Sequence, residues 1–168
     1  VVPVFDSVAL DGQLVGVALA QDDAPVERQN DANVAGALVA YVPVDDARLM
    51  ALLPWLQDDK AEKTLHNAKE AWVLLRQKGV TLRGVTCDTM LASFLADPTR
   101  LIPHGIEAVV KDVLHRTVAP AKDLTGGGQA QKLLKDVDAT AVAAWAGDVA
   151  RAIAAMRAPL LERVRDAD

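Results

Sequence analysis

The chain has 168 residues, 51% of them hydrophobic, which is enough apolar material for one compact domain spanning residues 1–168. Its 18 Lys and Arg residues are outnumbered by 23 Asp and Glu residues, and a net charge of -5 argues against tight, autonomous DNA binding. A single cysteine, Cys87, excludes an internal disulfide and a zinc site made of several cysteines. No apolar run approaches the roughly 20 residues that cross a bilayer, so we expect a cytoplasmic protein with no membrane partner.

The first third of the chain predicts three strands followed by a helix. Apolar, β-branched runs occupy residues 1–5, 14–20 and 36–44, and the polar segment that carries Pro25 predicts an exposed loop between the last two. Asp45 or Asp46 then caps a helix through Leu56. Its leucines recur on one side, which predicts that this side packs on the core: Leu49, Leu52, Leu53 and Leu56.

The middle of the chain alternates short strands and helices. A strand is expected at residues 63–66, a helix at 68–78, an extended segment at 81–85, and a helix from the Asp88 cap to residue 96, ended by Pro98. Gly79 supplies the stop of the first helix. One face of that helix is predicted to be lined by Ala68, Ala71, Leu75 and the neighbouring Trp72.

The last third is mainly helical. A helix is expected at residues 106–115, a mobile loop with three glycines at 122–131, and an Ala-rich helix from 138 to about 165. Gly147 and Asp148 predict a break in that helix, with Asp148 capping its final segment. Strands followed by helices interleaved with short strands predict an α/β fold, a mixed sheet flanked by helices.

Local motifs taken alone predict no chemistry. The three glycines lack both the GxGxxG spacing and the Lys-Ser/Thr that complete a phosphate-binding loop, and the three histidines have no metal-ligand spacing. Cys87 is expected to be a buried structural thiol. Five basic side chains gather in one region but are expected to be solvated helix faces: Lys111, His115, Arg116, Lys122 and Lys132.

One longer pattern is specific because its spacing is long and uneven. The segment LHNAKEAWVLLRQKGVTLRGVTCDTMLASFLADP carries Asn67, Lys69, the pair Arg83 and Gly84, and then Asp88 at the start of DTML. It resembles the second exonuclease motif, with its following helix, of the 3′-5′ proofreading domain of bacterial family A DNA polymerases, the DNA polymerase I group. Weaker similarity extends over nearly the whole chain, and the resemblance implies a ribonuclease H-like fold.

Active members of that group hydrolyse phosphodiesters with two divalent metals held by carboxylates. Matched position by position, the resemblance places Ala71 where the second motif has Asp, and Val142 and Ala146 where the last helix has Tyr and Asp. On the first strand Asp6 matches an acid, but Val8 stands where Glu is expected. Asp6 is therefore at most one remaining carboxylate, and a turn residue is the favoured interpretation.

These replacements indicate a vestigial exonuclease domain that holds no metal or other cofactor and supports a covalently linked polymerase domain, whose own site uses Mg²⁺. The parent chain would be a monomeric DNA-directed DNA polymerase that meets DNA through its polymerase domain, and Val1 in place of Met suggests a piece of that longer chain. Two alternatives stay open. One is a weak or one-metal exonuclease that uses Asp6, Glu70 and Asp148, and the other is a binding module for RNA or protein on the same fold.

Overall fold

The structure is a computed structural model that describes residues 1–6, 12–21, 38–99 and 103–167. Strands β1 (Val2–Phe5), β2 (Leu14–Gln21) and β3 (Leu38–Pro43) form an antiparallel sheet in the order β1-β2-β3. The three predicted opening strands are therefore confirmed. The predicted loop around Pro25, together with Ser7, Val8 and Asp11, lies outside the described residues.

Two shorter strands extend this arrangement. Strand β4 (Lys63–Leu65) pairs in parallel with β5 (Val85–Asp88). The backbone nitrogen of Val1 donates a 2.8 Å hydrogen bond to the carbonyl oxygen of Thr64, which places the start of β1 beside β4. The structure therefore has a three-stranded antiparallel sheet and a two-stranded parallel sheet that adjoin at Val1, and the predicted α/β class is confirmed.

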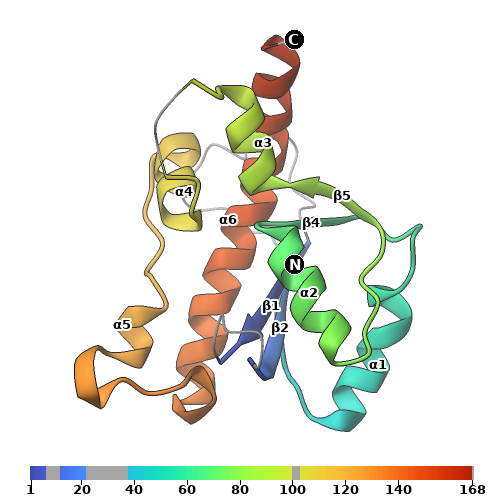
Figure 1. The fold of residues 1–168 in the computed structure, drawn as a ribbon, viewed down its shortest axis with the longest axis vertical. Coiled ribbons are helices and arrows are strands. Elements are labelled where there is room, and N and C mark those ends of the chain that lie inside the picture. The colour runs from blue at the N-terminus through green and yellow to red at the C-terminus, as the bar shows by residue number, and fades with distance from the viewer. Residues whose placement is uncertain (7–11, 22–37, 100–102, 168) are drawn as a thin grey trace.

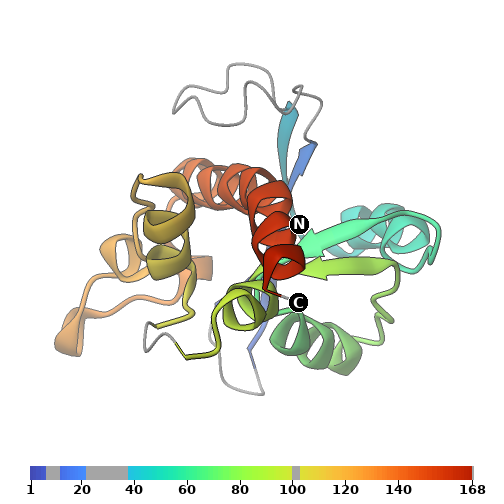
Figure 2. The ribbon, with the colours of Figure 1, turned by 90° about the horizontal axis from the view of Figure 1, so that it is seen from above.

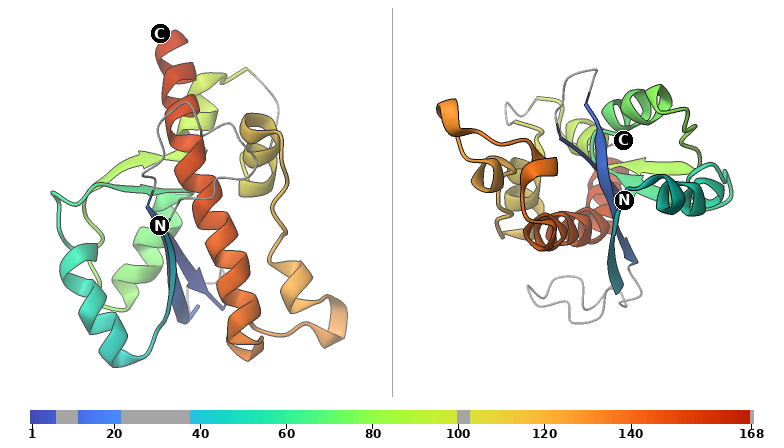
Figure 3. Two further views of the ribbon diagram at one scale, coloured as in Figure 1. Left: turned by 180° about the vertical axis from the view of Figure 1, so that it is seen from behind. Right: turned by 90° about the horizontal axis from the view of Figure 1, so that it is seen from below.

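Helices cover the sheet on two sides (Figures 1 and 3). On one side lie α1 (Asp46–Leu56) and α2 (Ala68–Gln77). On the other, α6 (Ala139–Asp166) contacts all three antiparallel strands, and α4 (Ile106–Leu114) packs against α6. Figure 2, seen from above, shows α6 between α4 and the β4-β5 pair.

Apolar burial on both sides holds the layers together. The leucines of α1 pack with Leu65, Leu75 and Val80 beneath α2, which confirms the predicted inner side of α1. Between α6, α4 and α3 (Thr89–Ala96) lies a second cluster that includes Val109, Ile153 and Met156. No helix among the described residues is both long enough and apolar enough to traverse a bilayer.

Helix α6 corrects the predicted break at Gly147 and Asp148. The helix runs unbroken for 28 residues and is capped by Asp138, whose carboxylate accepts from the backbone N–H groups of Thr140 and Ala141. Gly147 is buried in the helix and faces Val39, so its missing side chain permits close packing on β3. Asp148 instead accepts hydrogen bonds from the Arg116 guanidinium at 3.2 and 3.3 Å.

Three further local expectations were wrong. The segment 122–131, expected as a loop, contains the short helix α5 (Lys122–Thr125) and a 3-10 turn (Gly128–Ala130). The extended segment expected at 81–85 is displaced, because β5 begins only at Val85. Trp72 does not face the core, since its residue surface is 52% exposed.

The turn before β5 is organised around a buried ammonium group that the sequence did not reveal. Lys63 is 1% exposed, and its Nζ donates to the carbonyl oxygens of Asp58 (2.9 Å) and Ala61 (2.7 Å). It also lies 4.7 Å from the centre of the Trp55 ring. Burial lowers the pKa of Lys63, and the neighbouring carboxylates of Asp58 and Asp59 oppose that shift.

Candidate functional site

The positions singled out in the sequence surround β1 from two sides. Val4 on β1 shares a buried cluster with Val142 and Ala146 of α6. The next residue, Phe5, packs against the cluster that contains Ala71 of α2. Successive strand residues point to opposite faces, so the end of β1 connects the two helices.

Three of these positions are buried hydrocarbon. Ala71 is 7% exposed, Val142 1% and Ala146 0%. Methyl and isopropyl groups carry no atom that can coordinate a cation, whereas Mg²⁺ takes oxygen ligands. In this arrangement the three side chains contribute packing to their clusters and supply no ligand.

Asp6, at the end of β1, has a carboxylate that is already engaged. Its Oδ1 accepts a 2.7 Å hydrogen bond from the backbone N–H of Gln13, and its own N–H donates to the Gln13 carbonyl oxygen. Its Oδ2 lies 3.5 Å from the ammonium of Lys135, and the Asp6 side chain is only 6% exposed. Asp6 thus ties the end of β1 to Gln13, just before β2, and Lys135 supplies a positive charge beside its carboxylate.

The other two acids of the weak-exonuclease alternative have separate partners. Glu70 accepts a 2.5 Å hydrogen bond from the Asn67 side-chain amide. Asp148 is paired with Arg116 and lies 3.9 Å from Arg151. Within the described residues, no three His, Cys, Asp or Glu side chains form a group that could hold a metal ion. The described donor set therefore does not fit a pair of magnesium ions.

The start of α2 is built by a residue 20 positions later in the chain. The Asp88 carboxylate accepts from the backbone N–H groups of Asn67 (3.0 Å) and Ala68 (2.8 Å), and also from those of Met90 (2.9 Å) and Leu91 (3.5 Å). The predicted cap of α3 is confirmed, but the same carboxylate also caps α2. Asn67 stands at the N-cap position of α2 with a left-handed backbone (φ 56°), but its side chain makes no cap hydrogen bond. Its residue type is the only sequence signal for this second role of Asp88.

His66 precedes this double cap and is oriented by Thr89. The Thr89 hydroxyl donates to the Leu65 carbonyl oxygen at 3.2 Å, so the 2.9 Å contact with His66 is a hydrogen bond donated by Nδ1. Nε2 is buried without a hydrogen-bond partner among the described residues. Burial lowers the pKa of His66, and the Asp88 carboxylate opposes the shift.

Cys87 is buried and His115 is exposed at the end of α4, both as expected. Cys87 is 5% exposed, and burial raises the pKa of its thiol, opposed by Arg157. His115 ends α4 with a left-handed backbone. Neither lies among the residues that surround the end of β1.

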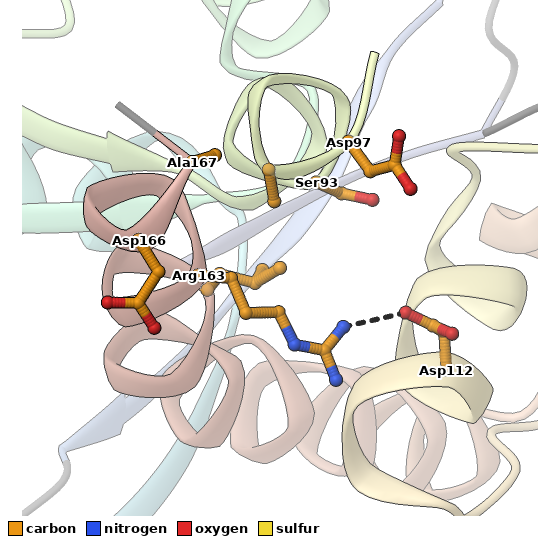
Figure 4. A pocket seen from close by; sticks show the side chains of 8 residues that line it. Ser93, Asp97, Asp112, Arg163, Asp166 and Ala167 are labelled. Atoms are coloured by element: carbon orange, nitrogen blue, oxygen red, sulfur yellow. Dashed lines mark hydrogen bonds and ion pairs between the residues drawn. The ribbon is translucent and has the colours of Figure 1, made fainter. Parts of the chain in front are cut away.

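A separate hollow of about 390 Å³ lies between α3, α4 and the end of α6 (Figure 4). The Arg163 guanidinium donates a 2.8 Å hydrogen bond to Asp112 across it, so these two charges neutralise each other. Asp97 and Asp166 belong to its wall, but none of the positions around β1 does. This hollow is therefore distinct from the candidate site.

Taken together, the two sheets, the helical layers on either side and the positions around β1 define a ribonuclease H-like α/β domain. The chain matches the family model of the DNA polymerase I, ribonuclease H-like domain over residues 9–156, and it belongs to that family. The fold also resembles a solved structure described as the POL domain of Pol1 from M. smegmatis in complex with DNA primer-template and dNTP. The TM-score is 0.69 at 21% identity, over 98% of this chain and 23% of that one.

Relatives of known identity agree. The chain is 34% identical over 113 residues to DNA polymerase I of Geobacillus stearothermophilus, covering 67% of this chain and 12% of that protein. It is 36% identical over 113 residues to DNA polymerase I of Rhizobium leguminosarum, covering 64% and 11%. A 56-residue stretch is 50% identical to DNA polymerase I of Mycobacterium tuberculosis (strain ATCC 25618 / H37Rv), covering 33% and 6%. The chain thus corresponds to a small part of these polymerases.

Proposed function

We propose that this exonuclease-like domain of DNA polymerase I has lost two-metal hydrolysis and acts as a structural support for a polymerase domain in the same chain. The observation that carries the proposal is the chemistry around the end of β1. Ala71, Val142 and Ala146 offer hydrocarbon there, and the one acid found there among the described residues, Asp6, is held by a backbone N–H and by Lys135. One engaged carboxylate cannot hold two cations.

The packing gives a physical reason for retaining such a domain. Ala146 and Val142 are integral to the cluster between α6 and the sheet, and Ala71 to the cluster beneath α2. Loss of metal ligands therefore leaves both clusters intact, and Lys135 provides a permanent cation beside Asp6. A stable folded unit can then present a fixed surface to a neighbouring domain.

The proposal includes the rest of the expected polymerase. The relatives are bacterial DNA polymerases much longer than this chain, which supports a covalently linked polymerase domain, contact with DNA through it, and Mg²⁺ in its site. We include a monomeric state and a cytoplasmic location in the same proposal. Reading the parent gene beyond residue 168 tests this context, and absence of polymerase motifs there would favour a binding module on the same fold.

A nuclease assay tests the loss of hydrolysis. The purified chain is incubated with 3′-labelled single-stranded DNA in millimolar Mg²⁺ or Mn²⁺, with EDTA and an Asp6→Ala variant as controls. We expect the same background cleavage with either metal and with EDTA, for the unaltered chain and for Asp6→Ala. Metal-dependent cleavage that disappears in Asp6→Ala would overturn the proposal and restore the weak-exonuclease alternative.

Isothermal titration with Mn²⁺ separates binding from turnover. At millimolar Mn²⁺ we expect no saturable binding heat that depends on Asp6. The unaltered chain and the Asp6→Ala variant should therefore give the same titration curve. The Asp45→Ala variant is the matched control, because Asp45 carries the same formal charge and is likewise engaged by a backbone N–H and a basic side chain, both of Arg48. Saturable binding that requires Asp6 but not Asp45 would show a metal site at the end of β1.

A further inference from the structure

Helix α3 presents an apolar face to solvent. Leu91, Phe94 and Leu95 are 55%, 48% and 57% exposed, and their spacing places them on one side of the helix. The residues of α3, TMLASFLA, include no charged side chain, although 24% of the whole chain is charged. A helix that faces water on one side usually carries charged residues there. We call these three residues the α3 face, and its exposed hydrocarbon indicates a contact with another protein surface.

The opposite side of α3 is fixed to the rest of the domain. The Thr89 hydroxyl donates to the Leu65 carbonyl oxygen, and Ala92 belongs to the core cluster between α3, α4 and α6. The Phe94 ring meets the His104 ring edge-on, with 5.6 Å between the ring centres. The α3 face is therefore held in one arrangement before any partner binds, which lowers the entropy lost when an interface forms.

The helix that carries the α3 face lies beside the end of α6. Ser93 and Ala96 of α3 line the same 390 Å³ hollow as Arg163 and Asp166, which belong to the last turns of α6. Figures 1 and 4 show these last turns next to α3. A domain joined to the end of α6 therefore starts close to the α3 face and can reach it without a long linker.

The hollow gives this side of the molecule an acidic rim. Asp97, Asp112 and Asp166 line it together with a single cation, Arg163, whose guanidinium donates to Asp112 at 2.8 Å. An apolar centre with a polar rim is the usual composition of a protein interface, and partners match the charge of that rim. An acidic rim repels anionic lipid and nucleic acid, so the occupant that fits is a protein surface with an apolar patch and basic side chains around it.

We infer that the α3 face is the surface on which the polymerase domain of the same chain docks, through an apolar patch with a basic rim. The inference rests on the proposed function, which supplies the linked domain, and adds the place and the chemistry of the contact. A tethered domain has an effective concentration of millimolar order, at which a small apolar contact is sufficient. A second copy of this chain is a poorer occupant, because it would bring two acidic rims together.

Photo-cross-linking in the full parent polymerase tests the contact. Phe94→p-benzoylphenylalanine places a photoreactive ring on the α3 face, and Met50→p-benzoylphenylalanine places the same ring on α1, at a position that is 64% exposed and outside that face. After irradiation and digestion, mass spectrometry identifies the joined peptides. We expect position 94 to join a peptide of the polymerase domain in the same molecule, and position 50 not to join that peptide.

A second pair of variants measures how far the contact holds the domains together. In the parent polymerase, Leu91→Gln/Leu95→Gln should speed tryptic cleavage between the domains about 5-fold to 50-fold, because the docked state loses apolar burial and opens more often. The matched control is Met50→Gln/Trp72→Gln, which removes two large exposed apolar side chains outside the α3 face and should leave the cleavage rate unchanged. In the 168-residue chain both pairs should shift the Tm by no more than about 2 °C, which establishes that each variant folds.

Three results overturn the inference. Position 94 joins no peptide of the polymerase domain, it joins a second copy of the chain instead, or the control pair speeds cleavage as much as the α3 pair. A polymerase domain that is present but does not contact position 94 overturns this inference and leaves the proposed support role standing on another surface. A parent gene without polymerase motifs overturns both, so the two failures are distinguishable.

Discussion

Asp88 offers the sharpest test of how this fold is assembled, because one carboxylate caps two helices. Its Oδ1 accepts from the N–H groups of Asn67, Met90 and Leu91, and its Oδ2 accepts from that of Ala68. Asp88→Ala removes both caps. Loss of one N-cap costs about 1 kcal/mol, and half-buried N–H groups left without acceptors add to this. We therefore expect the free energy of unfolding to fall by about 2–3 kcal/mol.

Urea denaturation followed by circular dichroism measures this loss, and thermal unfolding should show a decrease in Tm of about 4–12 °C for a domain of this size. Asp138→Ala is the matched control, because Asp138 caps only α6. It should cost about 1 kcal/mol. The loss of stability in Asp88→Asn should lie between those of Asp88→Ala and Asp138→Ala. The amide keeps one acceptor oxygen, but it turns an N–H donor toward a backbone N–H. An Asp88→Ala loss no larger than that of Asp138→Ala would refute the double-cap reasoning.

Three other perturbations probe the turn, the pH response and the core. Gly84→Ala should destabilise by about 3 kcal/mol or more, because a Cβ there collides with the carbonyl oxygens of two residues that hold Lys63, on a left-handed backbone. Between pH 7 and pH 5.5, stability should fall, because burial lowers the pKa of His66 below its ordinary 6.5 and only the unfolded chain then takes up the proton. Ala146→Asp should cost about 3–5 kcal/mol at pH 7, and millimolar Mg²⁺ should not recover the Tm.

Each of these has a matched comparison. Gly79 also has a positive φ, but no atom lies within 4 Å of the Cβ that Gly79→Ala would add, so this variant should lose only about 1 kcal/mol of stability. Equal losses of stability in Gly79→Ala and Gly84→Ala would contradict the collision at Gly84. His66→Asn should reduce the fall in stability with acid, and an unchanged fall would contradict the assignment to His66. A Tm of Ala146→Asp that rises with Mg²⁺ would contradict the proposed loss of metal binding.

Local signals in the sequence predicted most element boundaries correctly. Asp45 and Asp88 each begin a helix as expected, because the cap and the N–H groups that it satisfies lie within a few residues. The leucine spacing of α1 likewise predicted its buried side. The predicted break at Gly147 and Asp148 was wrong because it rested only on the low intrinsic helix preference of these two residue types. The packing of Gly147 on Val39 and the pairing of Asp148 with Arg116 outweigh that preference.

Other features depend on partners far away in the chain. The direction of Trp72 could not be read from α2 alone, because an apolar ring next to Ala71 fits either edge of the inner face. Lys135 meets Asp6 across most of the chain, and no local pattern marks either residue for the other. The buried ammonium of Lys63 is equally unpredictable, because its acceptors are backbone carbonyls, which every residue carries.

The sequence by itself determined the family, the α/β class and the residue types available at the end of β1, because these follow from motif spacing, hydrophobic periodicity and side-chain chemistry. The tertiary structure alone decided that Asp88 joins two helix starts, that Lys135 neutralises Asp6 and that Trp72 is exposed. The physical reason is that short-range hydrogen bonding is encoded by neighbouring residues. The partner of a charged or aromatic side chain is fixed only when separate segments pack together.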